Sequence, residues 1–165
     1  MPALQPVRGT RDILPDEMRR HAQALGFSSN FSILDREDAR DLMNEVLERL
    51  DLRKTPGLRL PKADVLVAIG SFAANTLRTP EAVLGERYAY HLDRLPEILR
   101  AIEAYAARKR ELQLMDFDDL LVHWRALLQQ PGEAAESFAF RFEHVLVDEY
   151  QDTNRLQCEI VDLLA

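Results

Sequence analysis

The most informative stretch of the sequence reads HVLVDEYQDTN, residues 144–154. Its first four residues, 144–147, form a short β-branched apolar run, which predicts a buried parallel strand. Two carboxylates, Asp148 and Glu149, follow at the carboxyl end of this strand, where the ligand sites of α/β proteins lie. The first can hold Mg²⁺, usually through water, because this hard cation prefers oxygen ligands. The second can orient and deprotonate an attacking water, so the pair suits a site that hydrolyses nucleotides.

A simpler interpretation of the two acids is a solvated acidic turn after a buried strand. The rest of the chain offers no second convincing strand, and one strand cannot form a sheet. A helix is expected from about Asn154 onward. We therefore expect one strand and one helix of an incomplete P-loop-type α/β core, attached to a mainly α-helical bundle.

Helical periodicity dominates the remaining sequence. Apolar residues recur at spacings of three and four, and Asp, Thr-Pro and Gly residues mark the expected helix ends. We expect helices over residues 15–25, 35–50, 63–74, 80 onward, 88–113 (bent or divided at Pro96) and 116–130, and a short helix ending within 138–142. Phe117 and Trp124 share the apolar stripe of the helix at 116–130, so we expect them in the core rather than stacked on bases.

Length and composition indicate a globular protein. The chain has 165 residues, enough for one ordinary domain or one domain plus a fragment, and 47% of them are apolar. A single cysteine, Cys158, excludes an internal disulfide and a Cys-rich zinc site, and we expect it to pack as a small helix residue. No apolar run reaches the ~20 residues of a membrane span, and the first ten residues hold no secretory signal. A cytoplasmic location is the default expectation.

The charge balance argues against a molecule-wide attraction to nucleic acid. There are 28 acidic and 21 basic residues, which gives a net charge of −7. Contact with DNA phosphates would need a local patch, and residues 108–110 (Arg-Lys-Arg) and 19–21 (Arg-Arg-His) are the candidates. Short charged runs on helices are more often solvated faces, which is the interpretation we favour for both.

Residues 148–154, Asp-Glu-Tyr-Gln-Asp-Thr-Asn, resemble motif II, the Walker B box, of UvrD/PcrA/Rep-type superfamily 1 DNA helicases. Residues 30–35 (Asn-Phe-Ser-Ile-Leu-Asp) resemble the segment that opens the helical 1B subdomain of that family. Residues 115–121 (Met-Asp-Phe-Asp-Asp-Leu-Leu) resemble the segment that closes it. The order and spacing also fit, and the resemblance covers about residues 24–165.

This resemblance implies a role for each matching residue. Asp148 would hold Mg²⁺ of ATP·Mg through water, and Glu149 would be the catalytic general base. Gln151 and Asp152 would couple the nucleotide state to neighbouring motifs. The implied division is a leader of separate origin (1–23), a helical 1B-like subdomain (24–137) and a partial 1A motor core with motif II (138–165). The helical subdomain would touch single-stranded or partly duplex DNA, through residues that the sequence does not identify.

One departure from the family pattern limits the expected activity. A phosphate-binding loop needs Gly-x-x-x-x-Gly-Lys-Ser/Thr, and none of the six glycines here precedes a lysine. A lysine that the family often shows shortly after residues 69–71 is also missing. We therefore expect a fragment of an enzyme that couples ATP hydrolysis to 3′-to-5′ translocation on single-stranded DNA, inactive as an isolated chain and without tight binding of ATP or Mg²⁺. Its incomplete core should expose apolar surface and promote self-association.

Two other interpretations stay open. The chain could be a non-catalytic DNA- or protein-binding helical module, or a structural remnant without activity. A separate resemblance concerns the first twenty residues: Val7-Arg8-Gly9-Thr10-Arg11-Asp12-Ile13-Leu14-Pro15 is similar to the N-terminal leader of histidyl-tRNA synthetases. A chance match in an irregular leader is the alternative, and a function related to the synthetases ranks last.

Overall fold

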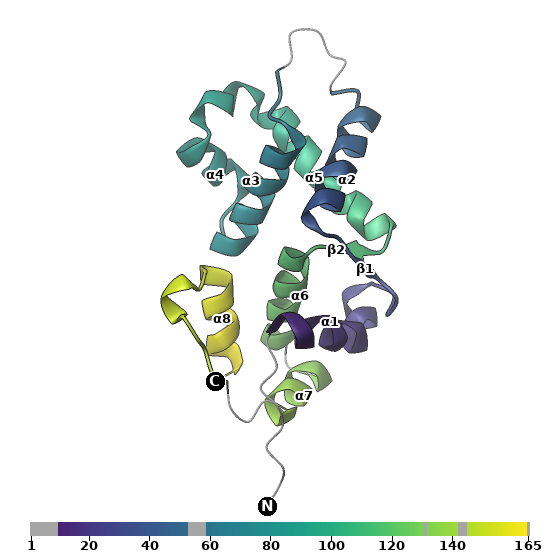
Figure 1. Ribbon diagram of the computed structural model, residues 1–165, viewed down its shortest axis with the longest axis vertical. Helices are drawn as coiled ribbons and strands as arrows, with labels where there is room; N and C mark the ends of the chain where they lie inside the picture. The colour runs from purple at the N-terminus through teal and green to yellow at the C-terminus, as the bar shows by residue number, and fades with distance from the viewer. Residues whose placement is uncertain (1–9, 53–58, 131, 142–144, 165) are drawn as a thin grey trace, which may run out of the picture.

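The computed structural model describes residues 10–52, 59–130, 132–141 and 145–164, and over these residues the chain is mainly α-helical (Figure 1). The helices follow one another along the chain, as the periodicity predicts. The α-helices are α1 Thr10–His21, α2 Arg36–Arg49, α3 Ala63–Thr76, α4 Pro80–Arg87, α5 Leu95–Glu111, α6 Phe117–Gln129, α7 Glu133–Arg141 and α8 Arg155–Leu164. The 3₁₀ helices are η1 Ala22–Leu25, η2 Ala89–Arg94 and η3 Tyr150–Asp152.

Side-chain caps fix the helix starts where the sequence predicts them. Asp35 accepts hydrogen bonds from the backbone N–H groups of Glu37 (2.8 Å) and Asp38 (2.9 Å), so α2 begins one residue later. Asp116 forms a reciprocal capping box with Asp119 at the start of α6. Thr79 caps α4, in which proline occupies the first turn. These predictions are confirmed.

Proline and glycine mark helix boundaries at two of the three positions where the sequence predicts it. The predicted division at Pro96 is confirmed, because η2 ends at Arg94 and α5 starts with Pro96 in its first turn. Near the N-terminus, α1 begins at Thr10 and contains Pro15, so the prediction that Pro15 opens this helix is wrong. Gly26 ends η1 with φ +78°, a left-handed conformation that glycine adopts without strain, and so acts as the predicted stop.

The strands of the described residues form one small parallel sheet. β1 (Ser32–Ile33) pairs with β2 (Leu114–Met115), with Ser32 opposite Leu114 and Ile33 opposite Met115. Hydrogen bonds from Ser32 N–H to Gln113 C=O (3.1 Å) and from Leu34 N–H to Met115 C=O (2.8 Å) extend the pairing. The sequence analysis did not predict this sheet. It brings the segments before α2 and before α6 side by side, so the helices between them leave and return at one place.

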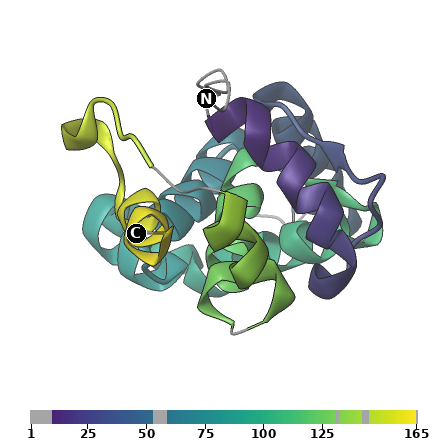
Figure 2. The same cartoon turned by 90° about the horizontal axis from the view of Figure 1, so that it is seen from below.

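Two hydrophobic clusters lie on either side of this sheet. Helices α2 to α5 bury the first, whose fully buried members include Met43, Leu66, Ile69, Leu84 and Ile98. Helices α1, α6 and α7 bury the second, and α8 lies beside α6 (Figures 1 and 2). Fully enclosed side chains of the second cluster are Met18, Met115, Leu120 and Phe138. Helix α1 therefore shares a core with α6 and α7, although the division of the chain at residues 23 and 137 stays a prediction.

Phe117 departs from the predicted core pattern of α6. It is the first residue of this helix and 46% of its surface is exposed, whereas Leu120 and Leu127 farther along the same stripe are buried. Trp124 fits the prediction better: it is half-buried, and its ring lies 5.9 Å from that of Phe138. Leu120, at the end of the first helical turn, is the first residue of the stripe to reach the core.

Candidate functional site

The segment 145–147, which leads to the two predicted site carboxylates, has no regular secondary structure and forms no strand. All three side chains are exposed, and Leu146 is 85% exposed. The prediction of a buried strand is therefore wrong for these residues, and residue 144 lies outside the described part of the chain. An apolar, β-branched run becomes a strand only beside a partner that pairs its N–H and C=O groups. The strands of the described residues pair with each other and lie elsewhere.

Residues 148–154, which we call the acidic loop, place Asp148 and Glu149 directly after this segment. Both carboxylates are exposed. The N–H of Glu149 donates a 3.0 Å hydrogen bond to Oδ1 of Asp148, and Gln151 Nε2 donates a short hydrogen bond to Oε2 of Glu149. Glu149 has φ +49°, a left-handed conformation uncommon for a residue with a side chain. This conformation lies at the start of the 3₁₀ turn η3.

The end of the acidic loop forms the start of α8. Thr153 Oγ1 donates a 2.7 Å hydrogen bond to the carbonyl of Tyr150, which closes the loop on itself. Asn154 and Gln157 cap the helix reciprocally: each backbone N–H donates to the other side chain, over 3.0 Å and 2.9 Å. Cys158 lies on the first turns of α8, where its Sγ is 3.1 Å from Oγ1 of Thr153. It is half-buried, in keeping with the predicted packing role.

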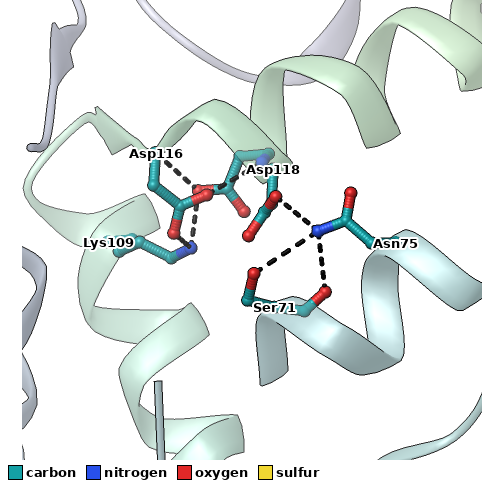
Figure 3. Close-up of polar contacts among 6 residues, drawn as sticks. Ser71, Asn75, Lys109, Asp116 and Asp118 are labelled. Atoms are coloured by element: carbon teal, nitrogen blue, oxygen red, sulfur yellow. Dashed lines mark hydrogen bonds and ion pairs between the residues drawn. The ribbon is translucent and has the colours of Figure 1, made fainter. Parts of the chain in front are cut away.

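A second set of polar residues connects the acidic loop to the rest of the molecule. Asn154 Nδ2 donates a 2.7 Å hydrogen bond to Oδ1 of Asn75, near the end of α3. Asn75 Nδ2 in turn donates to Oδ1 of Asp118 in the first turn of α6 (2.7 Å), and to Ser71 one turn back in α3 (Figure 3). These contacts were not predicted from the sequence, because a link between residues 79 positions apart leaves no local pattern.

Lys109 of α5 completes a group of side chains that we call the polar cluster (Figure 3). Its members are Ser71, Asn75, Lys109, Asp116, Asp118 and Asp119. The Nζ of Lys109 lies 2.6 Å from Oδ2 of Asp116 and 2.6 Å from Oδ2 of Asp119, and only 7% of the residue is exposed. Burial lowers the pKa of Lys109, but the attraction of the two carboxylates outweighs burial, so its pKa lies above the ordinary value. Burial also raises the pKa of Asp119, and the attraction of Lys109 offsets this only in part. Lys109 is thus a buried structural cation.

The basic residues considered as DNA contacts are largely occupied by acids. The prediction that residues 108–110 form a solvated face is wrong for Lys109, because its ammonium group is buried against Asp116 and Asp119. Arg108 lies 2.9 Å from a carboxylate oxygen of Glu45 on α2 and 3.2 Å from one of Glu111. In the run 19–21, Arg19 and Arg20 pair with acids one turn earlier in α1. These pairs lower the positive potential that phosphates would meet.

Helix α8 is held on α6 by a second polar contact. Arg125 Nε donates a 2.6 Å hydrogen bond to Oε2 of Glu159, and both side chains are about a third exposed. Leu156 and Ile160 are buried on the same helix. The acidic loop therefore ends in a helix that is fixed at both its start, through Asn154, and its middle, through Glu159.

A groove of about 660 Å³ lies apart from the acidic loop. Phe117 and Asp118 of α6 line it, together with Val67 and Ser71 of α3 and Arg40 of α2. It explains the exposure of Phe117, whose ring borders the groove. The groove touches the polar cluster at Ser71 and Asp118, but none of its lining residues belongs to the acidic loop.

The described residues contain no cluster of three or more His, Cys, Asp or Glu side chains placed to bind a metal ion. Asp148 and Glu149 are an exposed pair of carboxylates. None of the helices in the described part of the chain combines the length and the apolar character that a membrane crossing requires.

Comparison with known proteins places this arrangement in a family. The model of the UvrD/REP helicase N-terminal domain matches residues 15–165, which include the acidic loop, the polar cluster and both strands. The ATP-dependent DNA helicase PcrA of Staphylococcus epidermidis is 30% identical over 150 residues, and that of Staphylococcus aureus is 31% identical over 150 residues. Each match covers 90% of this chain and 19% of the relative. The chain belongs to the UvrD/REP helicase family, whose N-terminal domain it matches.

Proposed function

We propose that the acidic loop is the Walker B part of an ATP site in a DNA helicase. Asp148 would hold Mg²⁺ through water, and Glu149 would accept a proton from the attacking water. The magnesium ion would supply charge stabilisation for the phosphoryl group. The observation that carries this proposal is the family match over residues 15–165, which includes both carboxylates. Their exposure supports it, because both carboxylates are accessible to an incoming nucleotide.

The contacts of Glu149 support its assignment as the base. Gln151 donates to one of its carboxylate oxygens, which restrains the side chain and leaves the other oxygen for water. The N–H of Asp152 donates a 2.8 Å hydrogen bond to the carbonyl of Glu149, so the backbone of the loop is restrained as well. We assign Gln151 and Asp152 to the coupling of this loop with neighbouring nucleotide-binding segments. A base held in one orientation transfers protons more effectively than a mobile one.

The helical part of the chain, residues 24–137, would act as the 1B-like subdomain that contacts single-stranded or partly duplex DNA. Its opening and closing segments pair as β1 and β2, which supports a subdomain inserted into a motor core at one place. Residues 138–165 would belong to that core. The proposed parent activity is ATP hydrolysis coupled to 3′-to-5′ translocation, and the proposed location is cytoplasmic.

The 165 residues alone should not hydrolyse ATP. The chain spans 19% of the length of the PcrA relatives, and its sequence contains no Gly-x-x-x-x-Gly-Lys-Ser/Thr loop to hold the β- and γ-phosphates. Asp148 and Glu149 by themselves would bind Mg²⁺ or ATP weakly. We also propose that the chain self-associates, because two large apolar side chains are highly exposed: Phe140 on α7 (90%) and Leu146 before the acidic loop (85%).

A protein-binding helical module is the second candidate. It is favoured by one observation, the pairing of the candidate basic residues with acids, which leaves little positive surface for DNA on a chain of net charge −7. Salt-dependent binding of single-stranded DNA by the 165-residue chain would argue against this candidate, because each phosphate contact releases counterions.

A chimeric helicase tests the proposed function directly. Residues 15–165 replace the matching stretch of Staphylococcus aureus PcrA, and DNA-stimulated phosphate release is measured. We expect activity in the chimera and a loss of about 100-fold or more in kcat for Glu149→Gln, as for removal of a general base. Glu48→Gln, an exposed position on α2, serves as the matched control and should leave the rate unchanged. Equal rates for Glu149→Gln and the parent chimera would refute the assignment.

A further inference from the structure

One side chain connects the acidic loop to two other helices. Asn75 accepts a hydrogen bond from Asn154 through Oδ1 and donates one to Asp118 through Nδ2, each over 2.7 Å. All three side chains are half-buried, and they come from α3, the start of α8 and the first turn of α6 (Figure 3 shows Asn75 and Asp118). An amide carries both a donor and an acceptor, so Asn75 satisfies a donor on one side and a carboxylate on the other.

The other hydrogen bonds recorded for the acidic loop stay local. Those of Asp148 to Thr153 join residues within 148–158, such as Gln151 with Glu149 and Thr153 with Tyr150. The bond from Asn154 to Asn75, in contrast, connects the loop to a different part of the molecule, helix α3. The next anchor, Arg125 with Glu159, lies more than a helical turn farther along α8.

We propose that Asn75 is a positioning residue for the acidic loop, and that the chain Asn154–Asn75–Asp118 links this loop to α3 and α6. The inference rests on the proposed function only for the role of the loop in an ATP site, whereas the contacts of Asn75 are independent of it. Displacement of Asn154 by a change in the loop would break the bond to Asn75 or pull Asn75 away from Asp118. Only the second movement, in which the bond between Asn154 and Asn75 holds, reaches the first turn of α6.

The link continues beyond Asp118. Asp116 and Asp119 form the capping box of that same helical turn, and both hold the buried Lys109 of α5. A movement of this turn therefore changes the surroundings of a buried cation, which resists displacement because its charge has little access to bulk water. The acidic loop thus joins, through Asn75, a rigid polar cluster shared by α3, α5 and α6.

Amide hydrogen exchange of the 165-residue chain tests the inference without nucleotide. The probes are the N–H groups of Thr153, Gln157 and Cys158, which are hydrogen-bonded at the end of the loop. Asn75→Leu removes both functions of the amide at similar volume. We expect these three amides to exchange about tenfold faster, while amides of α2 and α5 change by less than about twofold.

A rescue variant separates positioning from a general loss of stability. Asn75→Asp places a second carboxylate against Asp118 and should loosen the loop as Asn75→Leu does. Adding Asp118→Asn to that variant restores a donor–acceptor pair in reversed order. The carboxylate introduced at position 75 still accepts from Asn154, so exchange should return to within about threefold of the parent. Thr76→Val is the matched control, because the recorded hydrogen bond of the Thr76 hydroxyl stays within α3, to the carbonyl of Phe72.

Each outcome decides the matter. Faster exchange confined to residues 153–158, with rescue in the double variant, supports the inference. A uniform increase over all helices, an unchanged loop in Asn75→Leu, or a double variant as loose as Asn75→Asp would overturn it. An inactive PcrA chimera would count against the proposed function and leave this exchange result standing, so the two failures are distinguishable.

Discussion

Lys109 lies with its Nζ atom 2.6 Å from Oδ2 of Asp119, and this contact joins the end of α5 to the first turn of α6. Asp119 also accepts a 2.9 Å hydrogen bond from the N–H of Asp116, so one carboxylate serves both as cap partner and as counter-ion. The capping box and the ion pair therefore support each other. They fix the turn that borders the chain of hydrogen bonds to the acidic loop.

Lys109→Met should destabilise the chain by about 2 kcal/mol, because Asp116 and Asp119 would face each other without a cation. The expected loss is at the low side for a buried pair, since both carboxylates retain some contact with water. Urea unfolding followed by circular dichroism measures it. Arg110→Met, an exposed arginine next in sequence, is the control and should stay within about 0.5 kcal/mol of the parent. Equal losses for the two variants would contradict the burial of Lys109.

Features that depend on neighbouring residues were predictable from the sequence. The caps at Asp35, Thr79 and Asp116 are satisfied within three residues, and so their helices begin where the sequence indicates. The division before Pro96 also follows from a local effect, the missing N–H of proline. The start of α8 directly after the acidic loop was also predictable, because Asn154 and Gln157 cap this helix locally.

Features that depend on distant residues were not. The run 145–147 has strand-like composition, but strand formation needs a partner, and none of the described strands lies beside it. Lys109 belongs to a charged run, but it is buried because it pairs with Asp116 and Asp119 of the next helix. The bond between Asn154 and Asn75 joins positions 79 residues apart and has no local pattern. The sequence points to Asp148 and Glu149 as candidate site carboxylates, but it does not predict the contact between Asn154 and Asn75 that anchors their loop.

His123 should make the stability of the chain depend on pH below neutrality. Burial, followed by the nearby charges of Arg110 and Lys109, lowers the pKa of His123 below its ordinary value of 6.5. The unfolded chain therefore binds a proton more readily than the folded one, and stability falls as pH decreases from about 6.5 towards the lower folded value. Above that window the stabilisation is fully present.

The measurement compares the parent chain with His123→Phe, which keeps a ring against Phe27. Free energies of unfolding at pH 7.5 and pH 5 should show a larger loss for the parent than for the variant. Carboxylates that titrate in this range contribute equally to both proteins, so the difference reports the histidine. Identical losses would contradict a lowered pKa at His123.

Arg125 and Glu159 should contribute measurably to the docking of α8 on α6. Their 2.6 Å contact is half-shielded from solvent, so a double-mutant cycle with alanine at both positions should give a coupling free energy of about 0.5–1 kcal/mol. Arg155→Ala provides the control, because Arg155 is exposed and lies 3.8 Å from the same carboxylate group. A coupling below about 0.2 kcal/mol, or one equal to that of Arg155, would contradict the anchoring role.

Leu146 should drive association between copies of the chain. Its side chain is 85% exposed in a segment, residues 145–147, that pairs with neither of the described strands. Such segments add strands to one another through their free N–H and C=O groups. Leu146→Asp should lower the average mass seen by sedimentation velocity at high concentration, with a free energy of unfolding within about 0.5 kcal/mol of the parent.

The matched control for this association is Leu92→Asp, another exposed leucine, in η2 of the helical bundle. Both variants add the same charge to a chain that is already net negative, so general repulsion affects them equally. Only Leu146→Asp removes apolar surface from the segment beside the acidic loop. A parent chain that stays monomeric over the whole concentration range, or an equal effect of the two variants, would show that this segment is not the contact.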